Sequence, residues 1–348
     1  TKNHWTFLID GTSRSAIEAA LVSMVEKGDK VLVPVFGRFG HLLTEISERV
    51  GATVIPLHKD WGEIFTEEEI ADALDQHKPS ILAICQGDTS TTMNQPLDYV
   101  GRLCRERGVI SYVDATASLV GNPLPVDEYQ IDICTVGLQK CLGGPSGSAP
   151  VTMTDEVADR IKRRWHVEKG IEPEGFKPGA GSRIQSNYFD LAMIMAYWSP
   201  DRLNHHTEAT SMLYCARECA RCVLEEGLQN CLERHSLASK AMVAGLKSLG
   251  LNLYGNQDFK MTNVTGVYIP EGVHSEAIRH DMLHDFGIEI GTSFGPLHGK
   301  IWRIGAMGYN ARKDAILRTL SSLTSVLKIH GVKLPDDDAA LAALEVYR

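Results

Sequence analysis

Three short segments of the sequence combine residue types that could bind a phosphate, balance a positive charge and bond covalently to an aldehyde. The first, Ile9–Ser15, joins an apolar run to an amphipathic run through small residues. A helix that begins here would offer free N–H groups and the positive end of its dipole to a phosphate. The same residues suit an ordinary turn in which Ser or Thr caps the helix. Taken alone, this loop leaves both readings open.

The second and third segments place an acid and an amine at the ends of apolar runs. Tyr112–Thr116 carries Asp114 directly after a buried-looking strand, and Thr135–Pro145 carries Lys140 before a glycine-rich turn. A strand-end Asp commonly caps a loop, which is the simpler reading of Asp114. Ligands of an open parallel sheet collect where strands end, so the two side chains are also candidates for one site.

Together, the three segments meet the chemical demands of pyridoxal 5′-phosphate (PLP). A lysine shielded from water can hold an aldehyde cofactor as a Schiff base, and an Asp can keep the cofactor's ring nitrogen protonated. A carboxylate about 3 Å from a pyridinium contributes on the order of 5 kcal/mol at an effective dielectric constant of about 20. We therefore predict Lys140 and Asp114 as the catalytic pair.

The elements that must position these residues follow from periodicity. Short apolar runs alternate with longer amphipathic stretches, which is the pattern of β-α units on a mostly parallel sheet. We expect strands at residues 6–9, 30–35, 53–57, 80–85, 109–114, 131–136 and 148–153. We expect helices at residues 15–26, 39–50, 67–76, 97–107 and 155–167, and helices without interleaved strands from Asn204 to Leu249.

The predicted fold class is therefore α/β, a mostly parallel sheet of the seven-strand type with helices on both faces, plus a smaller C-terminal α+β domain. We place the large domain at residues 1–250 and the small one at residues 251–348. The small domain is expected to have strands at 262–269 and 301–304, helices at 275–286 and 313–328, and a tail helix at 337–347.

Composition excludes several classes of protein. The 348 residues carry 35 Lys and Arg against 44 Asp and Glu, so no basic field suits a nucleic acid or an acidic membrane. No apolar run approaches the roughly 18 residues that a bilayer requires. The 8 Cys show no paired spacing of a metal or disulfide framework, so we expect reduced thiols in a cytoplasmic protein without a metal site. The chain starts at Thr1, and we expect that an N-terminal piece of the natural protein precedes it.

Six blocks in order along the chain carry a resemblance to a known family. They are Gly11–Leu21, Gln86–Leu97, Val113–Leu119, Gly137–Lys140, His205–Thr207 and Trp302–Gly305. In these blocks the chain resembles the class V branch of the fold-type I PLP-dependent aminotransferases. Within this family it is most similar to the enzymes of purine breakdown that use ureidoglycine as amino donor and glyoxylate as acceptor.

The resemblance implies a role for each matching residue. Lys140 would carry the cofactor, Asp114 would pair with its ring nitrogen, and Phe39 would stack on the ring, although a core Phe is the simpler reading. The remaining implied cofactor-binding residues are Thr116 on the other ring face, Thr89 near the phenolic oxygen, Thr12, Ser13, Arg14 and Gln139 at the phosphate, and Asn204 and Thr207 from a partner subunit. The family builds its sites at a homodimer interface, and we assign no chemistry to His205 or His206.

Substrate binding is implied for two residues. Arg303 matches the family's carboxylate-binding Arg, because a guanidinium can hold a carboxylate through two parallel hydrogen bonds. Asn204 stands where alanine–glyoxylate enzymes of the family usually have Tyr, and Ser13 stands where they usually have Gly. An amide in place of the phenol gives space and hydrogen-bonding groups that suit a ureido donor better than alanine.

Several other functions remain open. An alanine–glyoxylate or serine–glyoxylate (serine–pyruvate) aminotransferase would use the same residues, and a class V lyase or cysteine desulfurase would need a mobile, nucleophilic Cys. Cys141 is next to Lys140 but is expected to be buried. A non-catalytic PLP- or nucleotide-binding regulator is another alternative. The simplest alternative is an α/β protein in which Asp114 and Lys140 do not share a site.

Overall fold

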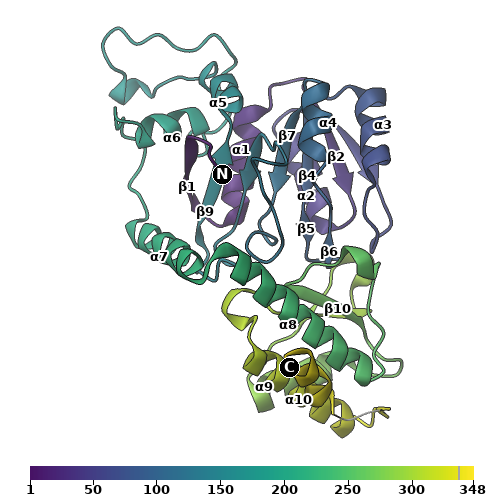
Figure 1. Cartoon of the computed structure of the whole chain (residues 1–348). Coiled ribbons are helices and arrows are strands. Elements are labelled where there is room, and N and C mark those ends of the chain that lie inside the picture. The colour runs from purple at the N-terminus through teal and green to yellow at the C-terminus, as the bar shows by residue number, and fades with distance from the viewer. Residues whose placement is uncertain (336–337) are drawn as a thin grey trace.

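A seven-stranded sheet lies at the centre of the N-terminal part of the chain in this computed structural model, which describes residues 1–335 and 338–348 (Figure 1). In spatial order the strands are β1 (Trp5–Gly11), β9 (Gly147–Met153), β8 (Ile133–Thr135), β7 (Ile110–Asp114), β4 (Ile81–Cys85), β2 (Lys30–Val35) and β3 (Thr53–His58). β9 runs antiparallel to both of its neighbours, and the other strand pairs of this sheet are parallel. The predicted mostly parallel α/β sheet is confirmed.

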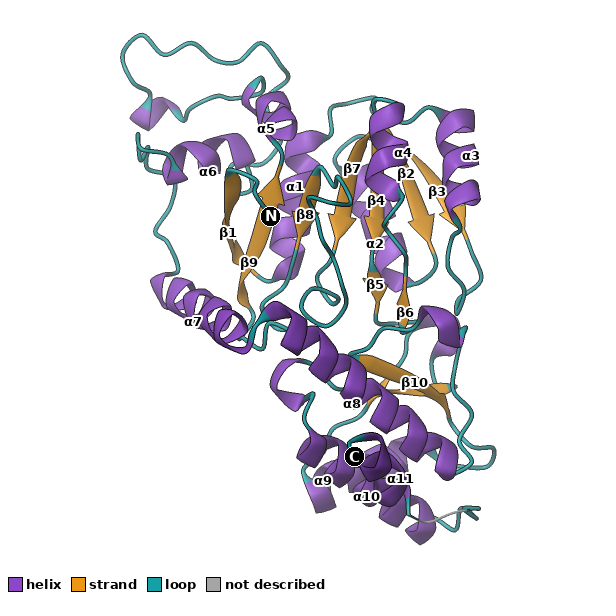
Figure 2. Ribbon diagram, viewed as in Figure 1, coloured by secondary structure: helices purple, strands orange, loops and turns teal. Residues whose placement is uncertain are grey.

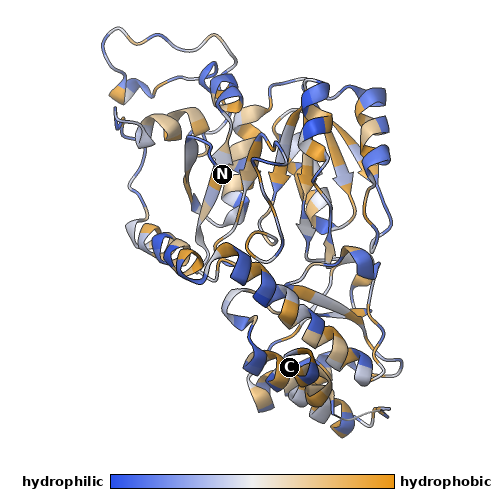
Figure 3. Ribbon diagram, viewed as in Figure 1, coloured by the Kyte–Doolittle hydropathy of each residue, from blue (hydrophilic) through white to orange (hydrophobic). Residues whose placement is uncertain are grey.

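Helices cover both faces of this sheet, which explains why its central strands are apolar on both sides. α1 (Ser13–Met24) and α2 (Arg38–Arg49) lie on one face, and α3 (Glu67–His77) and α4 (Val100–Glu106) lie on the other (Figure 2). Every residue of β4 is buried, as expected for a strand covered from both sides. α3 begins with a capping box between Thr66 and Glu69. The outward sides of α3 and α4 are hydrophilic, whereas the strands between the layers are largely hydrophobic (Figure 3).

The C-terminal part forms a second core below the carboxyl ends of the central strands (Figure 2). Its elements are β10 (Val264–Tyr268), β11 (Gly291–Thr292), β12 (Ile301–Gly305), α9 (Ser275–Phe286), α10 (Lys313–Ile329) and α11 (Ala339–Val346). α8 (Leu228–Ser248) adds Ala238, Met242 and Leu246 to this core, although it directly follows α7 (Thr210–Glu226). The division after residue 250 stays a prediction.

Several predicted elements differ from those observed. The helix expected at 155–167 ends at Lys162 (α5, Asp155–Lys162), and the helices expected from Asn204 begin only at Thr210. Two short strands, β5 (Gly87–Asp88) and β6 (Met93–Asn94), were not predicted. The tail helix begins at Ala339, and Asp337, where it was expected to start, lies outside the described residues.

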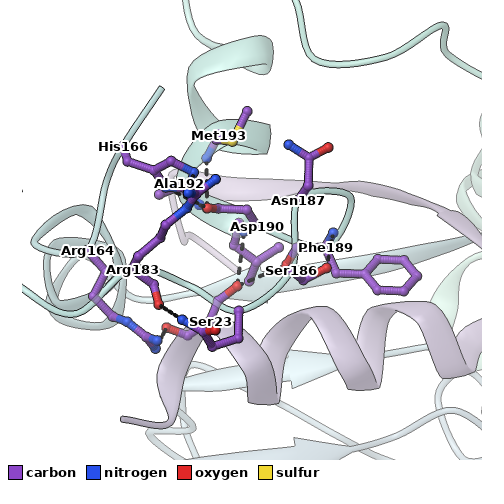
Figure 4. A network of polar contacts seen from close by, with 12 residues as sticks. Ser23, Arg164, His166, Arg183, Ser186, Asn187, Phe189, Asp190, Ala192 and Met193 are labelled. Atoms are coloured by element: carbon purple, nitrogen blue, oxygen red, sulfur yellow. Dashed lines mark hydrogen bonds and ion pairs between the residues drawn. The ribbon is translucent and has the colours of Figure 1, made fainter. Parts of the chain in front are cut away.

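A buried polar network explains why α5 ends early and why the unpredicted α6 (Leu191–Trp198) forms (Figure 4). The side chain of Arg164 turns inward and donates hydrogen bonds to the carbonyls of Val22, Ser23 and Val25 at the end of α1, at 3.3, 2.8 and 2.8 Å. Asp190 Oδ1 caps α6 by accepting from the backbone N–H groups of its first residues. The chain beyond α5 is therefore tied to α1 and not free to continue as a helix.

No helix in the described part of the chain is both long and apolar enough to span a membrane.

Candidate active site

A cavity of about 190 Å³ lies where the central parallel strands end. Nine of the predicted cofactor-binding residues line it: Thr12, Ser13, Arg14, Phe39, Thr89, Asp114, Thr116, Gln139 and Lys140. Ile17, Leu42, Gly87 and Ala117 complete the wall, and the sequence analysis did not single them out. Asp114 and Lys140 therefore meet in one cavity, which removes the reading in which they are unrelated.

The start of α1 forms one end of the cavity and directs backbone N–H groups toward it. Thr12 is the N-cap residue but its side chain makes no capping hydrogen bond, and the first turn contains no acidic residue. A helix start of this kind leaves N–H groups free for an anion. Gln139 donates from Nε2 to Ser13 Oγ at 3.0 Å, whereas its buried Oε1 has no hydrogen-bond partner within the described ranges. Gly137 keeps this end open, because a Cβ there would lie 2.9 Å from both Gln139 Oε1 and Ser13 Cβ.

The opposite wall carries Asp114, the last residue of β7. Its neighbours in the sheet are Cys85 of β4 and Thr135 of β8, so the carboxylate is delivered from the middle of the sheet. Oδ1 accepts a hydrogen bond from the backbone N–H of Thr116 at 2.9 Å. Burial raises the pKa of Asp114, so a cationic partner in the cavity would stabilise its ionised form.

Lys140 enters the cavity from a tight turn that follows β8. The turn is closed by hydrogen bonds from Gly143 N to the Lys140 carbonyl and from Gly144 N to the Leu138 carbonyl, at 3.0 and 2.9 Å. Gly143 has a φ of +76°, which favours glycine. Burial lowers the pKa of Lys140, and the nearby positive charge of Arg303 lowers it further. An amine in this environment is more nucleophilic at neutral pH than an exposed lysine.

Asp88 places Phe39 at the cavity, and the sequence analysis had assigned it no role. Its buried carboxylate accepts from the backbone N–H of Phe39 at 2.8 Å through Oδ2 and from Ser90 N at 2.9 Å through Oδ1. A Cβ at Gly37 would lie 2.3 Å from Asp88 Oδ2, so this approach requires glycine. Asp88 lies within the block Gln86–Leu97, but an Asp two residues before a Ser is typical of a turn in which the Asp side chain accepts from its own loop, so it gave no sign of a contact with Phe39.

Arg303 reaches from β12 of the C-terminal part to the edge of the cavity. Its Nε donates to the carbonyl of Thr292 at 2.6 Å, and Nη1 donates to the carbonyl of Thr89, a cavity residue, at 2.7 Å. The guanidinium lies over the ring of Phe294, 4.9 Å from its centroid. Its remaining N–H groups are available to a carboxylate beside Lys140.

Asn204 and Thr207 do not line this cavity, and both are exposed on the segment between α6 and α7. The prediction that they complete the site of a partner subunit is compatible with their exposure but is not tested by a single chain. The residues that do line the cavity fit PLP: an uncapped helix start for the phosphate end, a buried acid for the ring nitrogen, and a lysine of lowered pKa for the aldehyde.

Comparison with known proteins supports the same assignment. The class V aminotransferase family profile matches residues 1–301. The chain is 49% identical over 349 aligned positions to (S)-ureidoglycine–glyoxylate transaminase of Bacillus subtilis, covering 100% of this chain and 84% of that protein. It is 34% identical to alanine–glyoxylate aminotransferase of Felis catus, covering 94% of this chain and 76% of that protein.

Solved structures agree. The crystal structure of ureidoglycine–glyoxylate aminotransferase from Bacillus subtilis superposes with a TM-score of 0.93 at 48% identity, covering 100% of this chain and 86% of that one. An alanine–glyoxylate aminotransferase structure from Nostoc has a TM-score of 0.87 at 36% identity, covering 94% and 82%. With the cavity described above, these findings show that the chain belongs to the class V aminotransferases, a family of PLP-dependent transferases.

Proposed function

We propose that this enzyme binds PLP at Lys140 and transfers the amino group of ureidoglycine to glyoxylate, giving glycine, in cytoplasmic purine breakdown. The observation that carries the cofactor assignment is the single cavity lined by Lys140, Asp114 and the uncapped start of α1. The donor assignment is supported by the 49% identity to the ureidoglycine enzyme, against 34% to the alanine enzyme from cat. The described cysteines are all free thiols, in keeping with a reducing compartment.

Bound PLP would supply an aldehyde that condenses with amines and a ring that takes up electrons from the substrate Cα. Asp114 would hold the ring nitrogen protonated, and the positive charge opposite it would stabilise the buried carboxylate. Arg303 would bind the substrate carboxylate and so fix the Cα next to Lys140. The neutral Nζ of Lys140, favoured by its lowered pKa, would take the proton from Cα as a general base.

Donor and acceptor would use this site in turn, because both carry a carboxylate for Arg303, whose guanidinium lies near Lys140. We therefore expect ping-pong kinetics, with parallel lines in double-reciprocal plots at several fixed glyoxylate concentrations. Intersecting lines would contradict the shared site.

We also propose a homodimer with shared sites. Asn204 and Thr207 are exposed and without a role in their own chain's cavity. The helices that follow them carry exposed apolar side chains, Tyr214 and Leu224 of α7 and Leu228 of α8, which a second subunit would cover.

A donor panel tests the proposed substrate. Glycine formation from glyoxylate is measured with freshly prepared ureidoglycine, L-alanine and L-serine, and sulfide release is measured with L-cysteine. We expect kcat/KM to be highest for ureidoglycine. A higher value for alanine or serine would assign the alternative aminotransferase activity, while sulfide release without amino transfer would indicate a desulfurase.

The variant Asn204→Tyr, compared with Asn187→Tyr as a control, tests the basis of this preference. We expect Asn204→Tyr to lower the ureidoglycine-to-alanine ratio of kcat/KM and Asn187→Tyr to leave it unchanged. An unchanged ratio in both variants would remove Asn204 from the substrate site.

A further inference from the structure

A second group of buried polar side chains lies outside the cavity, where the segment between α6 and α7 passes the end of β1 (Figure 1). His206 Nε2 is 3.3 Å from Asp10 Oδ2 and 3.4 Å from Glu208 Oε2. These three side chains are only 10–13% exposed. One ligand atom from each lies within 4.8 Å of the others.

The hydrogen bonds around His206 determine which of its nitrogens faces the acids. His205 Nε2 lies 2.9 Å from the carbonyl of Asn187, which can only accept, so Nε2 of His205 carries the proton. In neutral His205, Nδ1 is then an acceptor, and it lies 2.7 Å from His206 Nδ1. His206 Nδ1 is therefore the donor in this contact, and the Nε2 of neutral His206 points a lone pair at two carboxylates.

This arrangement leaves negative charge without compensation. Asp10 Oδ1, Glu208 Oε1 and His206 Nε2 are buried atoms without a hydrogen-bond partner in the part of the chain that the structure describes. Two carboxylates and an imidazole lone pair that face one another would be stabilised by a cation between them.

We propose that Asp10, His206 and Glu208 bind one divalent transition-metal cation of the Zn²⁺ type. A tetrahedral ion with bonds of about 2.0–2.1 Å holds its ligands about 3.3 Å apart, which matches the separations of 3.3 and 3.4 Å from His206 Nε2. One imidazole nitrogen and two carboxylate oxygens suit Zn²⁺ or Mn²⁺. His205 acts as the outer partner that orients the ligand imidazole.

Two aromatic side chains pack against the proposed ligands. The rings of Tyr188 and Tyr197 lie 5.3 and 5.2 Å from the ring of His206, and the Tyr188 hydroxyl donates to Asp10 Oδ2 at 3.2 Å. The hydrogen bond from Tyr188 helps to orient the Asp10 carboxylate, as outer partners of metal ligands do. The sequence predicted no metal site, because Asp10 is far along the chain from His206 and Glu208 and the three residues show no recognised ligand spacing.

The proposed ion would join two parts of the molecule that matter for the active site. Asp10 directly precedes the loop that holds Thr12, and His206 lies on the segment that carries Asn204 and Thr207. Binding would fix this segment against β1 and hold the two exposed residues ready for a partner subunit. The proposed ion takes no part in amino transfer, so ion binding can be tested independently of the proposed reaction.

Zinc titration of the PLP-loaded enzyme, dialysed first against EDTA, tests the proposal. Isothermal titration calorimetry is expected to give saturable binding of one Zn²⁺ per chain, and Zn²⁺ is expected to raise the Tm. Glu208→Gln and Asp10→Asn each remove one ligand charge with little change of shape. We expect each to weaken Zn²⁺ binding about tenfold or more and to abolish the rise in Tm.

Asp281→Asn is the matched control, because Asp281 contacts His280 and His330 in an exposed His–carboxylate group. We expect its Zn²⁺ affinity to equal that of the wild type. Far-ultraviolet circular dichroism identifies a variant that has not folded, in which case the other ligand variant decides. The absence of one-to-one binding, or equal affinity in Glu208→Gln, Asp10→Asn and Asp281→Asn, would overturn the proposal and leave a protonated His206 as the cation.

Discussion

Replacing Arg303 with Lys keeps the positive charge but removes the geometry on which carboxylate binding depends. Arg303 has five N–H groups and uses one on the Thr292 carbonyl and one on the Thr89 carbonyl. Three remain for a substrate carboxylate. A Lys ammonium has three N–H groups on a single nitrogen, so it cannot hold both carbonyls and also bind a carboxylate in two places.

The loss of at least one charge-assisted hydrogen bond, worth about 1.5–3 kcal/mol, predicts that kcat/KM of Arg303→Lys falls by about 10- to 150-fold. The decrease should appear for both donor and glyoxylate, because each presents a carboxylate to the same residue. Steady-state rates with either substrate varied measure it. The control is Arg318→Lys, whose exposed guanidinium donates to the Phe286 carbonyl and should be neutral. A decrease below threefold, or one confined to a single substrate, would refute this role of Arg303.

Three further predictions follow from single contacts. Gly137→Ala places a methyl group against Gln139 and Ser13 and is expected to weaken PLP binding. Absorbance titration of the apoenzyme with PLP measures the affinity, and an unchanged Tm of the apoenzyme shows that the fold is intact. Burial raises the pKa of Asp190 to about 6, so between about pH 4 and 6 the folded protein keeps a proton that the unfolded chain releases, and the stability of the wild type falls as pH rises. Urea unfolding of Asp190→Asn should therefore show a free energy of unfolding that gains up to about 3 kcal/mol relative to wild type between these pH values. A difference between the two proteins that does not change with pH would contradict the raised pKa of Asp190. Burial raises the pKa of Cys141 to about 11, so its thiol is a poor nucleophile and Cys141→Ala should keep most of the transamination rate. A hundredfold loss of rate would indicate that the thiol reacts as a nucleophile.

Local patterns predicted the centre of the sheet well because its central strands are buried on both faces. β2 was predicted with its observed bounds, and β4 and β7 within a residue, since apolar runs between turn residues have few other solutions. Helix ends that depend on distant contacts were not predictable in this way. α5 ends where Arg164 turns to cap α1, and nothing near Arg164 in the sequence reveals those carbonyls.

In the candidate site, too, residues placed by local sequence patterns were predicted, and residues placed by distant contacts were not. Lys140, Asp114 and the loop from Thr12 to Arg14 were predicted because each ends or begins an element, and strand ends share one edge of the sheet. Asp88 was missed because its role is to hold the backbone of Phe39, a contact between two loops. The group of Asp10, His206 and Glu208 was missed for a similar reason, since Asp10 is separated from the other two by most of the large domain.

The most direct test of the central claim is to identify the lysine that carries PLP. Borohydride reduction of the purified enzyme, followed by digestion and peptide mass spectrometry, reports this position. The account predicts that the visible absorption band is lost and that the phosphopyridoxyl mass is found on Lys140 alone. Among the described residues, Lys260 is the strongest alternative, because desolvation lowers its pKa to about 7. It is only partly buried, and its Nζ already donates to Thr92. A label on Lys260, or no label on any lysine, would contradict the account.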